Sequence, residues 1–397
     1  MAGVNISNAG LTFIRYLKGV TETLNHKSKA RALVQKDDRW TGSHIEGVVH
    51  VGRTSSLGWT SDGGALPAAD RQNYQNMKVY RRFFDGTIQI SDGAMAAASD
   101  TVNAAKTVQS SEMEGLLRDM LKAENGMFTR NGDGSVSTMK AAPSGTTLTV
   151  DDARMLWDGG TYDVYDTTLA TLRGTVTISK VTQAPTAAGY MTVTTTAASP
   201  SGTINGDKLV WHNALNKCIT GLDSLVDDAA STFQGIDAAT YTKYSSLVLS
   251  SADGTTNRDL TPTLFRQMMA GLAQKTGNDR PVDGLKALCT SYQGINVEEL
   301  YEGDLRLTPE SSTAGAAISS FQSALGRVDI LIDTDCVYNK LFLVDFGNIY
   351  RATQLPLGWR REGGQIFKRS DTSLNWTASV LEIAELYIKE RHTSAKL

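Results

Sequence analysis

Cysteine is scarce in this sequence, with three residues in a chain of 397. Cys218, Cys289 and Cys336 lie far apart, and none has the CxxC spacing of a zinc or redox site. An odd number of widely spaced cysteines also argues against a disulfide framework. The sequence therefore predicts free thiols that pack as small hydrophobic side chains.

Long hydrophobic runs are missing as well. No apolar run reaches the roughly 18 residues that a membrane-spanning helix needs. The opening stretch MAGVNISNAGLTFIRYLKGV also lacks the apolar core of a secretory signal peptide. These absences predict a protein without a membrane partner that is made in a cytosol-like environment.

Neither sign of charge is in large excess. The chain has 39 basic and 42 acidic residues, a net charge of −3. Proteins that bind nucleic acid over a broad face present a strongly basic surface. The balance of charge therefore argues against broad electrostatic binding to nucleic acid, although it leaves room for a local basic patch.

Motifs that carry chemistry are absent too. No histidine pairs with another ligand at metal-binding spacing, and neither GxxxxGK[ST] nor GxSxG occurs. The stretch from Asn131 to Asp133 lacks the later glutamate of a calcium loop, and GDGSVS lacks the third glycine of a dinucleotide loop. Asp333 and Asp335 follow a predicted strand, where Asp is a normal turn residue. We therefore expect no enzyme activity, no cofactor and no metal.

Helical periodicity is present in three segments. Residues 8–36 and 100–126 each place apolar side chains on one helical stripe, and 261–277 begins with a capping threonine and a proline. We expect Asp100 to cap the start of the second helix and Gly126 its end. At 1.5 Å per residue this helix is roughly 40 Å long, which suits the backbone of an elongated domain.

A projecting hairpin is predicted between residues 43 and 90. Segments 43–53 and 77–90 alternate as strands do, and the 23 residues between them show no periodicity. So long a connection is unusual inside a compact domain. Apolar residues at a tip usually seek a partner, so Trp59, Leu66 and Tyr74 favour a hairpin that lies on another subunit over a floppy surface loop.

The rest of the chain is rich in strands. Residues 144–216 contain many threonines and glycines in short alternating runs, which predict an inserted all-β module. Short strands and helices then alternate, as is typical of an α+β domain. The last run, 374–391, is partly apolar on both faces, so we expect a strand that is covered on both sides.

The sequence contains two basic clusters, YRR at 80–82 and WRREGGQIFKR at 359–369. Arginine and lysine in such clusters can contact phosphate. We favour salt-bridged interfaces or solvated loops for both of them.

The order of these elements resembles that of tailed-bacteriophage major capsid proteins. VVHVGRTSSLGWTSDGGALPAADRQNY resembles the outgoing arm and tip of the extended loop of that family, and KVYRRFFDGTIQISDGAMAAA its return strand and entry to the spine helix. TLTVDDARMLWDGGTYDVYD and GDKLVWHNALNKCITGLDSLVDD resemble the two ends of an inserted β domain. VDILIDTDCVYNKLFLVDFGNIY and WTASVLEIAELYIKER resemble the late axial-domain strands and the closing strand.

This resemblance implies an α+β fold of the Hong Kong 97 type with an all-β insertion. It also implies a division of the chain: 1–42 as N-terminal arm, 43–92 as extended hairpin loop, 93–143 as peripheral domain with the spine helix, 144–217 as inserted β-rich domain, 218–354 as mainly axial domain, and 355–397 as the return to the peripheral and axial core with a long C-terminal strand.

The function implied by the resemblance is that of a shell subunit. Such subunits assemble as hexamers and pentamers into an icosahedral phage head, the virion capsid, which encloses double-stranded DNA without binding it sequence-specifically. Assembly takes place in the cytoplasm of the bacterial host, with a portal, a maturation protease and a separate scaffold protein or none, and a decoration protein can bind outside. The candidate residues for contacts between subunits are Arg53, Trp59, Leu66, Tyr74, Arg81, Arg82, Phe83 and Phe84.

Covalent crosslinking through a lysine of the loop is known in the family, but this hairpin tip contains no lysine, so we expect it to be absent. Two alternatives stay open. One is the shell of a cellular nanocompartment. The other is a carbohydrate- or surface-binding β protein, or a hydrolase with a dispersed site, which the Thr- and Gly-rich insertion motivates.

Overall fold

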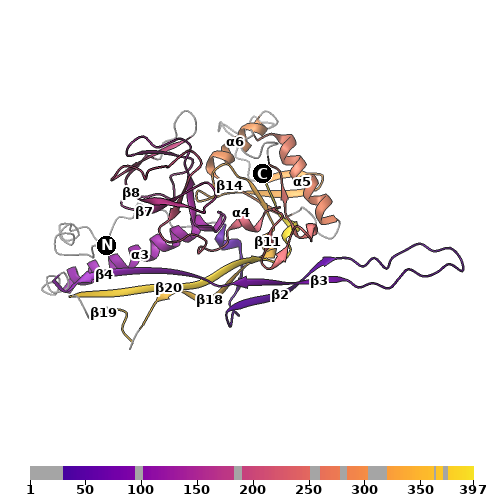
Figure 1. The fold of residues 1–397 in the computed structure, drawn as a ribbon, viewed down its shortest axis with the longest axis horizontal. Coiled ribbons are helices and arrows are strands. Elements are labelled where there is room, and N and C mark those ends of the chain that lie inside the picture. The colour runs from indigo at the N-terminus through magenta and orange to yellow at the C-terminus, as the bar shows by residue number, and fades with distance from the viewer. Residues whose placement is uncertain are drawn as a thin grey trace, which may run out of the picture. The chain divides into compact units, whose positions relative to one another are not determined.

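The computed structural model describes residues 30–93, 102–182, 190–250, 260–277, 284–302, 320–361, 364–369 and 374–397. These residues form helices and many strands, so the predicted α+β class is confirmed (Figure 1). The chain divides into two compact units. The first takes its described residues from 82–125 and 353–384, and the second from 30–81, 126–352 and 385–397.

The first unit pairs a long helix with antiparallel strands. It holds most of α3 (Val102–Phe128), of β18 (Ile349–Trp359) and of β20 (Asn375–Ile388), together with β4 (Arg82–Ser91) and β19 (Lys368–Arg369). Strand β4 pairs with β20 from Ser91 opposite Asn375 to Arg82 opposite Ala384. A Cβ atom on Gly86 of β4 would lie 2.6 Å from the Met120 sulfur, so α3 passes close to this strand where no side chain intervenes.

The second unit contains the hairpin and two larger sheets. The hairpin is β2 (His44–Gly52) and β3 (Asn73–Tyr80), and small elements nearby are β1 (Gln35–Asp37), β11 (Thr232–Phe233) and β12 (Ile236–Asp237). The insertion sheet has the order β5-β10-β7-β8-β9-β6. Its strands are β5 (Ser135–Thr138), β6 (Thr147–Val150), β7 (Thr161–Tyr165), β8 (Leu172–Thr182), β9 (Met191–Thr195) and β10 (Lys208–Trp211).

The third sheet has the order β13-β21-β17-β14-β16-β15. Its strands are β13 (Leu247–Val248), β14 (Lys286–Cys289), β15 (Ser320–Ser323), β16 (Gly326–Ile332), β17 (Phe342–Val344) and β21 (Ala395–Lys396). The helices of the same unit are α4 (Leu222–Leu225), α5 (Pro262–Thr276) and α6 (Ser291–Glu302). Thr261 caps α5 by accepting a hydrogen bond from the Leu264 amide, as its sequence predicts.

Several predicted boundaries differ from the structure. The predicted helix 8–36 lies outside the described residues up to residue 29, and its end is wrong, because 35–37 is strand β1. Helix α3 continues through Gly126 to Phe128. A Cβ atom at Gly126 would lie 2.1 Å from Met155, so the close contact with Met155 requires glycine at this position. Gly126 thus serves a close approach rather than a helix end, and the predicted cap Asp100 lies outside the described residues.

Two strand predictions also need correction. The predicted strand 77–90 is two strands, because β3 pairs with β2 whereas β4 pairs with β20. The insertion sheet begins earlier than residue 144, because β5 pairs with β10. By contrast, β20 matches most of the predicted strand 374–391. The predicted cover on both faces is found from Ala384 to Ile388, whereas Leu381 and Ile383 on one face are half-buried.

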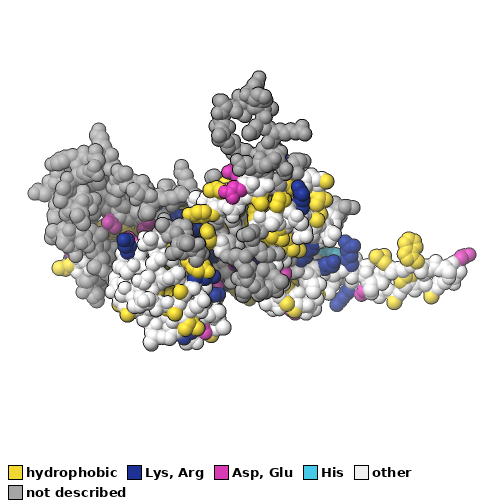
Figure 2. Space-filling view, turned by 90° about the horizontal axis from the view of Figure 1, so that it is seen from above, with side chains coloured by type: hydrophobic (Ala, Val, Ile, Leu, Met, Phe, Trp, Pro, Cys, Tyr) yellow, Lys and Arg dark blue, Asp and Glu magenta, His cyan; other side chains and the backbone are white. Residues whose placement is uncertain are grey.

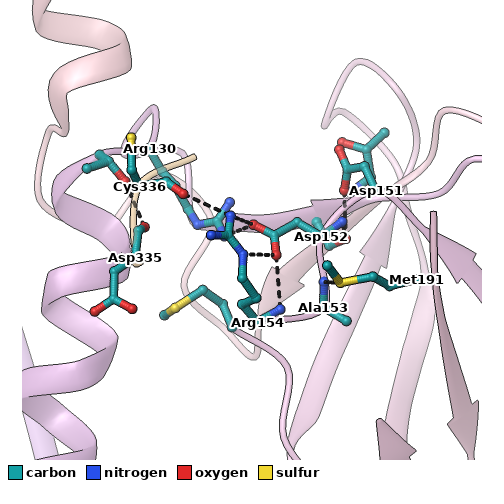
Figure 3. A network of polar contacts seen from close by, with 12 residues as sticks. Arg130, Asp151, Asp152, Ala153, Arg154, Met191, Asp335 and Cys336 are labelled. Atoms are coloured by element: carbon teal, nitrogen blue, oxygen red, sulfur yellow. Dashed lines mark hydrogen bonds and ion pairs between the residues drawn. The ribbon is translucent and has the colours of Figure 1, made fainter. Parts of the chain in front are cut away.

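A buried ion network joins the insertion sheet to the turn after β16 (Figure 3). Asp152 accepts hydrogen bonds from the Arg130 guanidinium at 3.0 Å and from the Arg154 guanidinium at 2.8 and 2.9 Å. The same Arg154 donates to the carbonyls of Thr334 and Cys336, at 2.7 and 2.8 Å. Burial opposes ionisation of Asp152, but the two arginines outweigh it and lower its pKa to about 2.

Candidate intersubunit contact surface

The root of the hairpin is packed into the second unit. Residues alternate between two faces of the ribbon, and on one face Val51, Met77 and Val79 are buried. These side chains share a hydrophobic core with Trp40, Ile236, Tyr244, Ala352 and Tyr387. Burial of alternate residues on both strands holds the base of the hairpin in place.

Hydrogen bonds anchor the same region of β3. The Lys78 amide donates to the Gln234 carbonyl at 2.7 Å, and the Gln75 side-chain amide donates to the Tyr241 hydroxyl at 2.8 Å. The two strands themselves pair from His44 opposite Tyr80 to Gly52 opposite Asn73. A ribbon anchored in this way points its far end in a defined direction from its own unit (Figure 1).

The other face of the ribbon carries polar cross-strand pairs. The His44 and Tyr80 rings lie 5.6 Å apart, and the His50 and Tyr74 rings 5.1 Å apart. Between these pairs Glu46 contacts Lys78 at 3.3 Å. Hydrogen bonds from His44 and Lys78 lower the pKa of Glu46, whose side chain is half exposed. Such pairs stabilise a two-stranded ribbon that has no sheet beside it.

The tip beyond Gly52 continues the ribbon instead of forming an open loop. Asp70 accepts hydrogen bonds from the Ser55 hydroxyl at 2.7 Å and its amide at 2.9 Å, and they lower its pKa to about 2. A Cβ atom on Gly58 would lie 3.0 Å from Pro67. The pairs Ser55–Asp70 and Gly58–Pro67 are both centred on the bond between residues 62 and 63. The outgoing and returning segments of the tip therefore keep one register.

The turn at residues 61–64 joins the two segments of the tip in this register. The Gly64 amide donates to the Ser61 carbonyl at 2.9 Å, and Gly63 has a φ of +75°. A positive φ at the third residue is what a type II turn requires, and glycine adopts it without strain. A strand rises about 3.3 Å per residue, which places the turn roughly 35 Å beyond the last buried residue of β2, Val51.

Large apolar side chains stand free on this tip. Trp59 is fully exposed, and Leu57 and Leu66 are 81% and 86% exposed. Trp59 and Leu66 occupy opposite positions of the ribbon register, so they share one region of the tip. Figure 2 shows hydrophobic side chains standing clear of the thin ribbon. An exposed apolar group at the end of an anchored ribbon is typical of a contact surface.

The structure brings the predicted contact residues into two groups. Trp59, Leu66 and Tyr74 lie on the hairpin, and exposed Arg53 lies where the tip begins. The four predicted residues Arg81, Arg82, Phe83 and Phe84 lie where the chain leaves the second unit, between residues 81 and 82, and enters β4 of the first.

Phe83 and Phe84 lie on opposite faces of β4. Phe83 is 51% exposed, whereas Phe84 is half-buried. We expect Phe83→Ala to weaken assembly with little change in subunit stability, because large aromatic side chains commonly dominate interfaces. Phe84→Ala should also lower subunit stability. Assembly yield and thermal unfolding of both variants measure this difference. A loss of thermal stability in Phe83→Ala as large as that in Phe84→Ala would contradict it.

Asp333 and His212 have metal-ligating side chains, but they make hydrogen bonds within the fold instead. Asp333 accepts from the Asp335 amide at 3.0 Å, as in a turn, and His212 bonds Asp163 at 2.8 Å. Across the described ranges, no group of three or more His, Cys, Asp or Glu side chains is arranged to hold a metal. Nor is any helix in that part of the chain long and apolar enough to cross a membrane. Cys218, Cys289 and Cys336 are free thiols.

One feature that the sequence did not predict is a groove in the first unit. It has a volume of about 490 Å³, and its lining includes Met113 of α3, Ile366, Phe367 and Trp376. Arg361 also lines it. The indole N–H of Trp376 donates to Asp92, which fixes the orientation of that ring. The only sequence signal was the Ile-Phe pair inside the basic cluster 359–369.

Comparison with known proteins identifies the fold. No family model and no curated protein sequence matches the chain. A chain of the cyanophage A-1(L) capsid asymmetric unit matches with a TM-score of 0.58 and 13% identity, over 98% of both chains. A chain of the capsid of the native GTA particle matches at 0.51 and 10%, over 99% of this chain and 97% of that one.

The capsid of Myoviridae phage XM1 matches with a TM-score of 0.50 and 6% identity, over 100% of this chain and 99% of that chain. At such low identity the likeness shows the fold alone. The chain therefore has the α+β fold of tailed-phage capsid subunits, the Hong Kong 97 type that the sequence resemblance implied, and the matches cover 98–100% of it.

Proposed function

We propose that this chain is a major capsid protein, the structural subunit of the icosahedral head of a tailed phage. The observation that carries the proposal is the anchored hairpin whose tip exposes Trp59, Leu57 and Leu66. A hairpin of this kind has no use in an isolated monomer, but it gives each subunit an arm for a neighbour. The full-length likeness in fold to phage capsid chains supports the same role.

In this role the subunits associate through heterologous contacts, in which one surface meets a different surface of the next copy. Such contacts close into hexamers and pentamers, and many weak interfaces together stabilise a shell. A net charge of −3 suits a wall that confines double-stranded DNA without binding it tightly.

The proposed partners follow from assembly of this kind. They are other copies of the chain, a portal, a maturation protease, a separate scaffold protein where one is needed, and in some particles a decoration protein. The protein would then be found in the virion, and in the cytoplasm of the bacterial host during assembly. The proposed role is structural and involves no catalysis.

Expression of the full chain, with and without candidate scaffold proteins from the same genome, tests the proposal. We expect closed particles or rings of five and six subunits by negative-stain electron microscopy. A bovine serum albumin sample at the same concentration controls for aggregates. Monodisperse monomers under every assembly condition would contradict the proposal.

A further inference from the structure

The groove of the first unit has the features of a receptor for an aromatic side chain. Its apolar lining combines Met113, Ile366, Phe367 and Trp376, and Arg361 lies among them. A guanidinium next to an aromatic-lined site can stack on an incoming indole, and the thioether of a methionine also contacts ring edges favourably. A volume of about 490 Å³ is large enough for a tryptophan with a neighbouring apolar residue.

The segment that supplies most of the groove lining is cationic, whereas Glu112 and Glu114 flank Met113 on α3. Segment 359–369 has four cationic residues and one acid. Arg360, Arg361, Lys368 and Arg369 are exposed, and Arg369 contacts Asp92 at 3.0 Å. A ligand for this groove should therefore be apolar at its centre and acidic around it.

The hairpin tip has the complementary pattern. Segment 54–70 carries two acids, Asp62 and Asp70, and no basic residue. Trp59 is fully exposed at its centre, with Leu66 opposite. The tip is thus apolar at its centre and acidic at its turn, where Asp62 lies, whereas Asp70 at its base lies next to Arg71. Its apolar centre and acidic turn match the groove and the cationic segment beside it.

We propose that the groove lined by Met113, Arg361, Ile366, Phe367 and Trp376 receives Trp59 from the hairpin tip of a second copy of this chain. This inference rests on the proposed function, because it requires copies of the chain to meet in an assembly. It adds the specific receptor for the hairpin and the residue that enters it. Leu66 would cover the rim, and Asp62 would lie among the arginines.

Site-specific photocrosslinking tests the pairing. The photoreactive amino acid p-benzoyl-phenylalanine is placed at position 59 of the full chain, and this chain is assembled with isotope-labelled wild-type chains. We expect irradiation to join position 59 to peptides that contain Met113 or 366–367, in pairs of unequal isotope content. The same probe at position 172, also an exposed apolar site, should not label the groove.

The outcomes separate the two proposals. Particles in which position 59 crosslinks elsewhere would overturn the groove assignment and leave the shell function intact. If every crosslink joins two unlabelled peptides although labelled wild-type chains are in excess, the contact lies within one chain, which also overturns the assignment. Absence of any assembly would contradict both.

A substitution measures the strength of the contact. Trp59→Ala should raise the subunit concentration needed for assembly by about 30-fold, as is typical for loss of an aromatic hot spot. Trp59→Phe should restore most of this loss, and Leu172→Ala should leave the concentration unchanged. Because Trp59 is fully exposed, its replacement should not affect folding. An unchanged assembly concentration for Trp59→Ala would overturn the inference.

Discussion

Removal of Ser55–Gln72 from the hairpin should leave a folded subunit that forms no closed shells. Within the described chain, the hydrogen bonds of these residues join them to one another or to Thr54 and His50, so the rest of the fold does not depend on them. The deletion leaves a two-residue connection between the paired residues Gly52 and Asn73. Changing that connection to Asn-Gly, through Arg53→Asn and Thr54→Gly, supplies the turn that such a hairpin prefers.

Two measurements check this result. Thermal unfolding and hydrogen exchange of β2 and β3 should match the wild-type subunit, whereas electron microscopy should show no shells. A second variant keeps the length of the tip but replaces Leu57, Trp59 and Leu66 with serine, and it should assemble as poorly as the deletion. Its matched control replaces the exposed Leu172 of β8 and Ile204 of the loop before β10 with serine. Normal shells from the deletion variant would show that the hairpin does not interlock the subunits.

Replacement of Asp152 with alanine should destabilise the second unit by about 3–5 kcal/mol, the usual cost of removing one partner from a buried ion pair. Arg130, whose side chain is 9% exposed, would lose its carboxylate partner, and so would Arg154. Arg154 would also hold the Thr334 and Cys336 carbonyls less firmly. The insertion sheet and the turn after β16 should therefore unfold more readily.

Hydrogen exchange of β5 and β10 together with urea unfolding measures this loss in subunits that have not assembled. Asp158→Ala is the matched control, because Asp158 is exposed in the same module and accepts a bond from the Val181 amide. We expect that control to lose about 1 kcal/mol, the contribution of an ordinary hydrogen bond. Equal losses for the two variants would show that the arginines gain little from Asp152.

The pH dependence gives an independent check on Asp152. Its pKa is 3.8 in a model compound and about 2 in the folded chain. Because the folded value is the lower one, the stabilisation is complete above about pH 5 and disappears as the pH falls through 2, a change of about 2 kcal/mol. The gap in stability between wild type and Asp152→Ala should shrink over that range. A gap that stays constant from pH 6 to pH 3 would contradict a low pKa at this site.

Several elements could be predicted from the sequence because their causes are local. The arms of the hairpin alternate in polarity, α5 starts with a threonine cap and a proline, and β20 has apolar residues on both of its faces. Periodicity and capping act within one turn or one strand, so they leave a pattern in neighbouring residues. The exposed apolar residues of the tip were found in the same way, because glycine and proline mark the tip as a connection.

Other features depend on residues far apart in the chain, and no local pattern reveals them. Strand β4 pairs with β20, almost 300 positions later, so the change of partner after Arg81 cannot be read from YRRFFDG. Gly126 looks like a helix end in the sequence, but it lies inside α3, where the close approach of Met155 requires a glycine. Pairing and close packing are decided by which distant surfaces meet, since the same residue types satisfy several local structures.

The two surfaces proposed for assembly differ in the same way: one is local in the sequence, and the other is formed by distant residues. The chain by itself specifies a hairpin with an apolar, acidic tip, because that composition lies within one short segment. Folding was needed to bring Met113 of α3 together with Phe367 and Trp376, which are more than 250 residues away in the sequence, and so to form the groove. A convex contact surface can be contiguous in sequence, whereas a concave one has walls from several elements, and only the tertiary structure brings those walls together.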